Sequence, residues 1–141
     1  MPEQETLARA QEDKREGKAP STQAGEFVRE EMHHIREGKH GARSAKQAIA
    51  IGLSKARRAG VKLPPPRKGT VSEKTRHQAE REYRKGQAHT GRKPSAKRSR
   101  SRLNALKREG RGAASHRALS RQAHTAAQRR RRRGPVTSRR G

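Results

Sequence analysis

The sequence predicts a mostly α-helical protein, in which a small helical hairpin precedes a long basic region that is largely disordered or conditionally helical. Composition gives the first observation: of 141 residues, 38 are Lys or Arg, 13 are Asp or Glu, the net charge is +25, and 26% are hydrophobic. Such a chain buries too little apolar surface to fold as one globular domain. Distribution gives the second: nine of the 17 apolar residues larger than Ala fall within residues 27–63. We expect the folded part there.

Residues 1–20 are expected to form a polar, acidic N-terminal helix. Within residues 3–16, Leu7 is the only apolar side chain larger than Ala. The stretch that starts at Gly17 and reaches Pro20 breaks the helical pattern. This helix therefore has little to bury.

Two amphipathic helices make up the predicted hairpin module at residues 21–63. In the first, apolar residues from Ala24 to Ile35 recur at the three- and four-residue spacing of one helix face. The second begins at Ser44, with Gln47 in the capping-box position. Its apolar stripe contains small residues that should let the two helices lie close together. These are Ala45, Ala48, Gly52 and Ala56.

A basic low-complexity region with marginal helices is predicted for residues 64–128. Its first three residues are prolines, which cannot continue a helix and mark a boundary. Three helix-like modules follow, at residues 72–85, 95–109 and 113–128. Because short helices without tertiary packing are marginal in water, these modules should become helical only on a partner that neutralises their charge. Residues 129–141 form the predicted Arg-rich tail.

The charge is unevenly distributed. Residues 1–37 hold 6 basic and 9 acidic side chains, a net of −3, whereas residues 38–141 hold 32 basic and 4 acidic, a net of +28. From Arg84 onward the only acidic side chain is Glu109. That half of the chain must find its counter-charge in another molecule, which favours a polyanionic partner.

Five consecutive arginines, Arg129–Arg133, suggest an arm that lies along a phosphate backbone and releases condensed counterions. The alternative is a solvated tail that only keeps the chain soluble. Candidate phosphate-binding residues elsewhere lie on the hairpin and in the middle of the basic region. The full set is Lys46, Lys55, Arg57, Arg58, Arg98, Arg100, Arg102, Arg129, Arg130, Arg131, Arg132 and Arg133. If about eight phosphates are neutralised, the logarithm of affinity should fall with the logarithm of salt at a slope near −7.

Other functional classes find no support in the sequence. We expect no enzyme, because no Gly-rich phosphate loop and no spaced nucleophile–base pair is evident. His33, His34 and His40 match no familiar ligand spacing, so no metal and no cofactor are predicted. One Phe, one Tyr and no Trp leave little for base stacking, which favours backbone electrostatics over base recognition. No apolar run is long enough for a membrane span.

A resemblance rests on three stretches of the first half of the chain: residues 25–31, residues 36–44 and residues 46–60. The last of these contains Lys-Gln-Ala-Ile-Ala-Ile-Gly-Leu-Ser-Lys-Ala-Arg. It resembles short bacterial proteins of unknown function that share the core Lys-Gln-Ala-Ile-Ala-Ile-x-Leu-Ser-x-Ala-Arg. The resemblance implies a bacterial cytoplasmic setting. The C-terminal half is similar to histone H1-like bacterial proteins in composition only.

The leading hypothesis is non-specific DNA binding or nucleoid association through phosphate contacts, in the cytoplasm. One alternative is an RNA-binding or ribosome-associated protein, for which the same charges suffice. Another is a protein-interaction module whose basic tail localises the complex, with a partner or a second copy bound through the hairpin. Sequence-specific recognition by the second hairpin helix is disfavoured, because a six-residue connection is too long for a helix-turn-helix.

Overall fold

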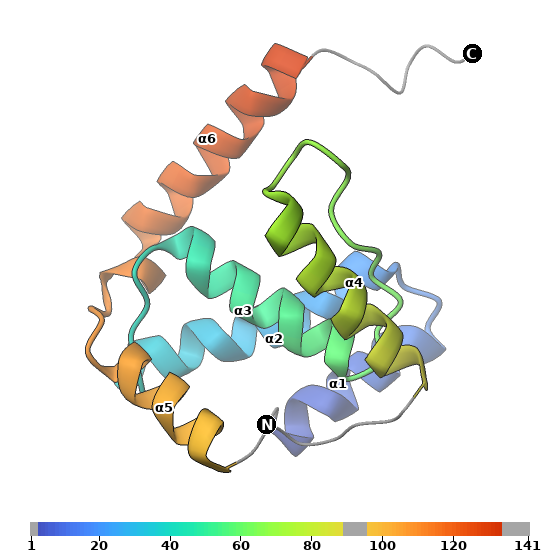
Figure 1. Cartoon of the computed structure of the whole chain (residues 1–141), viewed down its shortest axis with the longest axis horizontal. Coiled ribbons are helices and arrows are strands. Elements are labelled where there is room, and N and C mark those ends of the chain that lie inside the picture. The colour runs from blue at the N-terminus through green and yellow to red at the C-terminus, as the bar shows by residue number, and fades with distance from the viewer. Residues whose placement is uncertain (1–2, 89–95, 134–141) are drawn as a thin grey trace.

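The computed structural model describes residues 3–88 and 96–133, and this part of the chain is predominantly helical (Figure 1). Its elements are α1 (Gln4–Arg15), α2 (Pro20–Arg36), α3 (Ala45–Arg58), α4 (Glu73–Ala88), α5 (Ala96–Lys107), the short 3₁₀ segment η1 (Gly112–Ala114) and α6 (His116–Arg133). The prediction of a mostly α-helical protein is confirmed. Among these described helices, none combines the length and apolarity that crossing a membrane requires.

Helices α2 and α3 form the centre of the fold, and they form where the sequence predicts helices. Ser44 caps α3, because its Oγ accepts a hydrogen bond from Gln47 N at 3.1 Å. The Gln47 side chain returns the contact one residue further out, where its Oε1 accepts from Arg43 N at 2.6 Å. The two helices come very close: a Cβ at Gly52 would lie 2.6 Å from Val28 Cα.

Helix α1 packs against one end of this pair. Phe27 and Ala24 of α2 are fully buried there. They pack with Ala10 of α1, with Ala56 near the end of α3, and with Val61 just after that helix. The polar helix therefore contributes Ala10 to this core, and Leu7 is only partly buried beside it.

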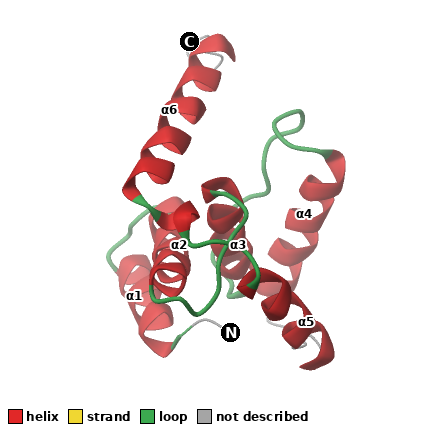
Figure 2. Ribbon diagram, turned by 90° about the vertical axis from the view of Figure 1, so that its left-hand side faces the viewer, coloured by secondary structure: helices red, strands yellow, loops and turns green. Residues whose placement is uncertain are grey.

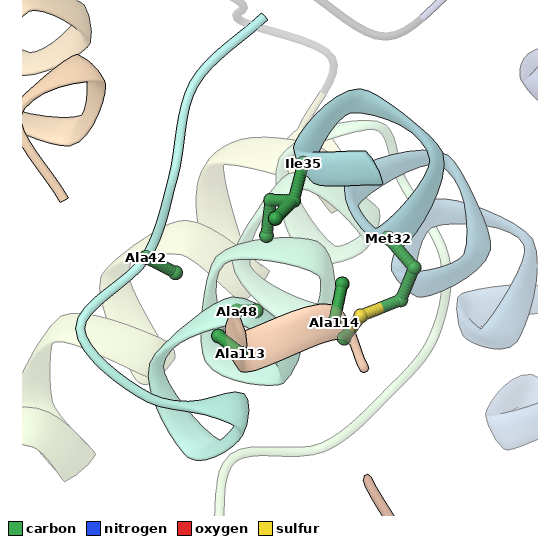
Figure 3. Packing of buried hydrophobic residues seen from close by; sticks show 6 residues of the cluster. All are labelled: Met32, Ile35, Ala42, Ala48, Ala113 and Ala114. Carbon is green, nitrogen blue, oxygen red and sulfur yellow. The ribbon is translucent and has the colours of Figure 1, made fainter. Parts of the chain in front are cut away.

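A second core cluster lies at the other end of the α2–α3 pair, and the far part of the chain completes it. Met32 and Ile35 of α2 meet Ala48 of α3 there. Figure 3 shows Ala113 and Ala114 of η1 beside these side chains. Ala114 is fully buried, and its carbonyl oxygen accepts a hydrogen bond from Arg36 Nε at 3.0 Å.

Helix α4 packs against α3. Ala79 is buried, and Gly86 lies so close to the end of α3 that a Cβ there would be 1.8 Å from the Arg57 carbonyl oxygen. Gln87 Nε2 donates to Gly60 O at 2.9 Å. These contacts join residues beyond the three prolines to the central helices.

The predicted hairpin with a long, largely disordered basic region is therefore wrong: the described residues form a multi-helix globular fold. The expectation failed because it counted only apolar residues larger than Ala as core formers. Here alanines at buried positions of α1, α4 and η1 make the contacts, and glycines let backbones touch. Small residues bury little area each, but close-packed helices gain many dispersion contacts.

Two backbone hydrogen bonds fasten the end of α5 and the segment after it to the α2–α3 connection. Gly41 N donates to Leu106 O at 2.8 Å, and Ala42 N donates to Gly110 O at 3.0 Å. Gly41 has no room for a side chain, since a Cβ would lie 2.0 Å from Glu109 O. From this junction η1 enters the core, and α6 projects away from α1, α2 and α3 in both views (Figure 1, Figure 2).

Candidate functional site

Helix α6 leaves the body of the protein with few contacts. Ser115 caps it, because its Oγ accepts a hydrogen bond from Ala118 N at 3.1 Å. Leu119, one turn on, is partly buried against the core cluster that contains Ile35. The rest of the helix extends beyond the other elements (Figure 2). It therefore offers most of its length to a partner.

Four arginines line one side of this helix, and we call them the α6 basic stripe: Arg117, Arg121, Arg131 and Arg132. At 100° per residue they fall within a sector of about 100° that also holds His124 and Gln128. All six side chains are exposed, and α6 contains no acidic residue. At 1.5 Å per residue the stripe is about 22 Å long. Within residues 3–88 and 96–132, the stripe arginines make no ion pair.

The predicted Arg129–Arg133 run belongs to α6 and continues its helix to the end of the described residues. Arg129 and Arg130 are exposed, but they point about 110° and 150° away from the centre of the α6 basic stripe. Only part of the run can therefore face one partner surface. The remainder of the predicted tail, residues 134–141, lies outside the described residues.

Helix α5 is a second basic element without acidic residues. Arg98, Arg100 and Arg102 are all exposed, with Arg98 and Arg102 on one side of the helix and Arg100 about 160° from them on the other. In both views α6 leads away from α5 (Figure 1, Figure 2). The structure therefore does not bring these residues together with the α6 basic stripe.

Two of the four candidates on the predicted hairpin are held within the fold. Arg57 is buried, and its Nε and Nη2 donate to Leu63 O at 3.2 Å and Pro64 O at 3.1 Å. Burial lowers the pKa of its guanidinium, and the Glu82 carboxylate opposes that shift. Lys55 binds Glu31, so neither cation is available to a phosphate.

The other two hairpin candidates are exposed. Arg58 Nε lies 3.7 Å from the Glu82 carboxylate, which also accepts a hydrogen bond from the Ser54 hydroxyl. Lys46 is exposed in the first turn of α3. Of the four, Lys46 is the one that the structure leaves open to a partner.

Arg117 and Arg121 were not predicted as phosphate-binding residues, because that prediction rested on dense runs of basic residues. The pattern was present in the sequence: Arg117 and Arg121 are followed by His124, Gln128 and Arg132 at the three- and four-residue spacing of one helix face.

A largely buried group of ionisable residues lies between α2, α3 and their connection, and we call it the carboxylate–histidine cluster: Glu30, Glu31, His34, His40 and Lys55. Glu31 is fully buried, Glu30 is 3% exposed and His40 is 7% exposed. Lys55 Nζ donates to Glu31 Oε1 and lies 3.9 Å from Glu30 Oε2. His40 Nε2 lies 3.1 Å from Glu31 Oε2.

Sequence reasoning overlooked Glu31, although a signal was present. Glu31 lies four residues after Phe27 and four before Ile35, which places a carboxylate on the apolar face of its helix. A charged residue at a core position is rare unless it is paired or coordinates a metal.

A family of unknown function (DUF6496) matches residues 20–68. The match spans α2, α3 and the extended segment after them, about a third of the chain. It agrees with the resemblance to proteins of unknown function, while the shared core string itself stays a prediction. No curated protein and no solved structure matches the chain.

Proposed function

We propose that the protein binds nucleic acid through its phosphate backbone, with little sequence preference, and that DNA is the favoured partner in a nucleoid-associated role. The observation that carries this proposal is the α6 basic stripe, which presents exposed arginines on a projecting helix without a single acidic residue. Arginine recognises phosphate well, because its planar guanidinium can donate two parallel hydrogen bonds. Such contacts position a duplex without reading its bases.

The stripe also sets the size of the electrostatic contribution. Its length of about 22 Å spans about six base pairs, which rise 3.4 Å each along one strand. Four neutralised phosphates give a salt slope near −3.6, at about −0.9 for each contact. This value replaces the slope near −7 expected from the sequence, because Lys55 and Arg57 are held inside the fold, and neither Arg129 and Arg130 nor the arginines of α5 lie on the stripe. Contacts made by α5 or Lys46 would add to it.

Two double variants of α6 test whether binding depends on the α6 basic stripe or only on the net charge of the helix. R121A/R132A removes two arginines of the α6 basic stripe, whereas R129A/R130A removes the same charge from the other sides of α6. Binding to duplex DNA is measured by fluorescence anisotropy between about 50 and 300 mM salt. We expect R121A/R132A to lower the slope by about 1.8 and to weaken binding about 60-fold at 0.1 M salt. R129A/R130A should have less than half of that effect.

Equal losses in the two variants would show that net charge, not the stripe, drives binding. An unchanged slope in R121A/R132A would overturn the proposal. A panel of duplex sequences should bind the wild-type protein with similar affinity. Competition between duplex DNA and structured RNA, at matched salt and phosphate concentration, then tests the choice of partner. Preferential displacement by RNA would favour the RNA-binding alternative.

A further inference from the structure

We propose that the carboxylate–histidine cluster binds a divalent transition-metal ion, with Zn²⁺ the best match, through Glu31, His34 and His40. One potential ligand atom from each of these residues lies within 4.8 Å of the other two. Glu31 and His34 share a face of α2 at three-residue spacing, and His40 comes from the connection to α3. The sequence predicted no metal because the histidines match no familiar ligand spacing, but the fold brings the rings of His34 and His40 together, with centroids 6.1 Å apart.

The orientation of His40 is the first physical argument. Its Nδ1 lies 2.9 Å from Gly41 O, and a carbonyl oxygen can only accept, so Nδ1 carries the proton. The other ring nitrogen, Nε2, faces Glu31 Oε2 at 3.1 Å. Two such atoms approach this closely only when a proton or a metal ion lies between them, and a metal ion at this point would bind both. Fixing one imidazole nitrogen on a backbone carbonyl is also how proteins orient histidine ligands.

Carboxylate oxygens without a hydrogen bond are the second argument. Within the described part of the chain, Glu31 Oε2 and Glu30 Oε2 are buried and accept no hydrogen bond, although His40 Nε2 lies 3.1 Å from the first and Lys55 Nζ lies 3.9 Å from the second. Their neighbouring oxygens are satisfied, by Lys55 Nζ on Glu31 Oε1 and by Glu3 N on Glu30 Oε1 at 2.7 Å. A buried carboxylate oxygen without a partner costs free energy, and coordination of a metal ion removes that cost.

His34 has an outer partner of the kind found around metal ligands. Its Nε2 lies 3.0 Å from Glu3 Oε1. A carboxylate on one imidazole nitrogen holds the ring in place and makes the other nitrogen a better ligand. Glu3, Glu30 and His34 also form a second close group, so a further carboxylate lies within reach of His34.

The donor set selects the class of metal. The chain has no cysteine, and two imidazoles with one carboxylate suit Zn²⁺ in a four-coordinate site whose last position holds water or a carboxylate. Bonds of about 2.0 Å at tetrahedral angles put two ligand atoms about 3.3 Å apart. The His40–Glu31 separation of 3.1 Å already matches that spacing. Lys55, on the other oxygen of Glu31, keeps the total charge of the buried group small.

A metal here would stabilise the junction that carries the late part of the chain. His40 directly precedes Gly41 and Ala42, whose backbone donors hold Leu106 and Gly110. A metal ion bound by His40 and by the ligands on α2 would hold this connection against α2. We therefore assign the ion a structural role.

The test uses the full-length protein, freed of nucleic acid by nuclease and high salt because bound phosphates would also capture metal. Isothermal titration with Zn²⁺ should show one site per chain, and the melting temperature should rise on addition of Zn²⁺. X-ray absorption should report nitrogen and oxygen ligands near 2.0–2.1 Å. H34A and H40A should each weaken Zn²⁺ binding by more than about 100-fold, because loss of an outer partner alone costs about 10–100-fold.

The matched control is H77A. His77 also lies between two glutamates, 3.7 Å from Glu73 and 3.9 Å from Glu80, but its side chain is 65% exposed. H77A should bind Zn²⁺ like the wild-type protein. Because His40 is buried, circular dichroism of the metal-free variants checks their folding, and H34A decides the outcome if H40A unfolds. Absence of a one-to-one site, or H34A binding as tightly as wild type, would overturn the proposal.

Discussion

Replacing Gly52 with Ala should destabilise the protein, although the same substitution at Gly25 should stabilise it. Both glycines lie inside helices, where Ala is favoured over Gly by about 1 kcal/mol. At Gly25 a new Cβ meets nothing within 4 Å. At Gly52 it would lie 2.6 Å from Val28 Cα and 2.9 Å from Val28 N. The two variants therefore share their effect on helix propensity and differ in the clash.

The size of that clash follows from the contact itself. Ordinary carbon–carbon contacts lie at about 3.5–4.0 Å, so α2 and α3 would have to separate by about 1 Å. Neither neighbour is the end of a flexible side chain, so the backbone must move. Overpacking of this kind costs about 1–3 kcal/mol, and we expect the upper end, about 3 kcal/mol. After the gain in propensity, G52A should be destabilised by about 2 kcal/mol and G25A stabilised by up to about 1 kcal/mol.

Urea unfolding followed by circular dichroism measures both free energies of unfolding. A difference of about 3 kcal/mol between the variants corresponds to about 6–12 °C in melting temperature for a chain of this size. If G52A were as stable as G25A, α2 and α3 would not be in backbone contact, and the reasoning on their packing would be refuted.

Two further changes test the charged interior. K55M leaves the buried Glu31 carboxylate without its ammonium partner, so it should lower the free energy of unfolding by about 3–5 kcal/mol. Urea titration measures this value, and a loss below about 1 kcal/mol would contradict the prediction. Burial, and then Asp13, raise the pKa of the Glu26 carboxyl above its ordinary value of 4.5, while Arg9 opposes the shift. A raised pKa contributes stability below the unfolded value and loses it as pH rises through the folded value. E26Q should therefore raise the melting temperature at neutral pH but not below pH 4.5, and an equal gain at both would contradict that sign.

The local helix signals in the sequence were sufficient to place most helices. Ser44 and Gln47 fixed the beginning of α3, and the apolar spacing from Ala24 to Ile35 fixed α2. The tertiary arrangement was not predictable in this way. Residues such as Ala113 and Gly86 carry no hydrophobic signal, because their importance comes from the absence of a large side chain at a close contact.

For the candidate site, composition identified the basic helices but not which cations are free. Lys55 and Arg57 belong to a run of basic residues that looks like a binding surface. Their engagement depends on Glu31, 24 residues before Lys55, and on the carbonyl oxygens of Leu63 and Pro64. Such pairings are set by tertiary structure, so no local pattern could reveal them.

The position of Ala114 in the core also has a consequence for how the chain is made. It bonds Arg36 across 78 residues of sequence. At about 5–20 residues per second, a ribosome needs about 4–16 s to add them. During that time the face of α2 that carries Met32 and Ile35 has no cover from η1, and the nascent chain exposes it to chaperones and to other chains. Synthesis of the basic half is therefore a step in folding the N-terminal half, and a stalled or truncated chain would be prone to aggregate.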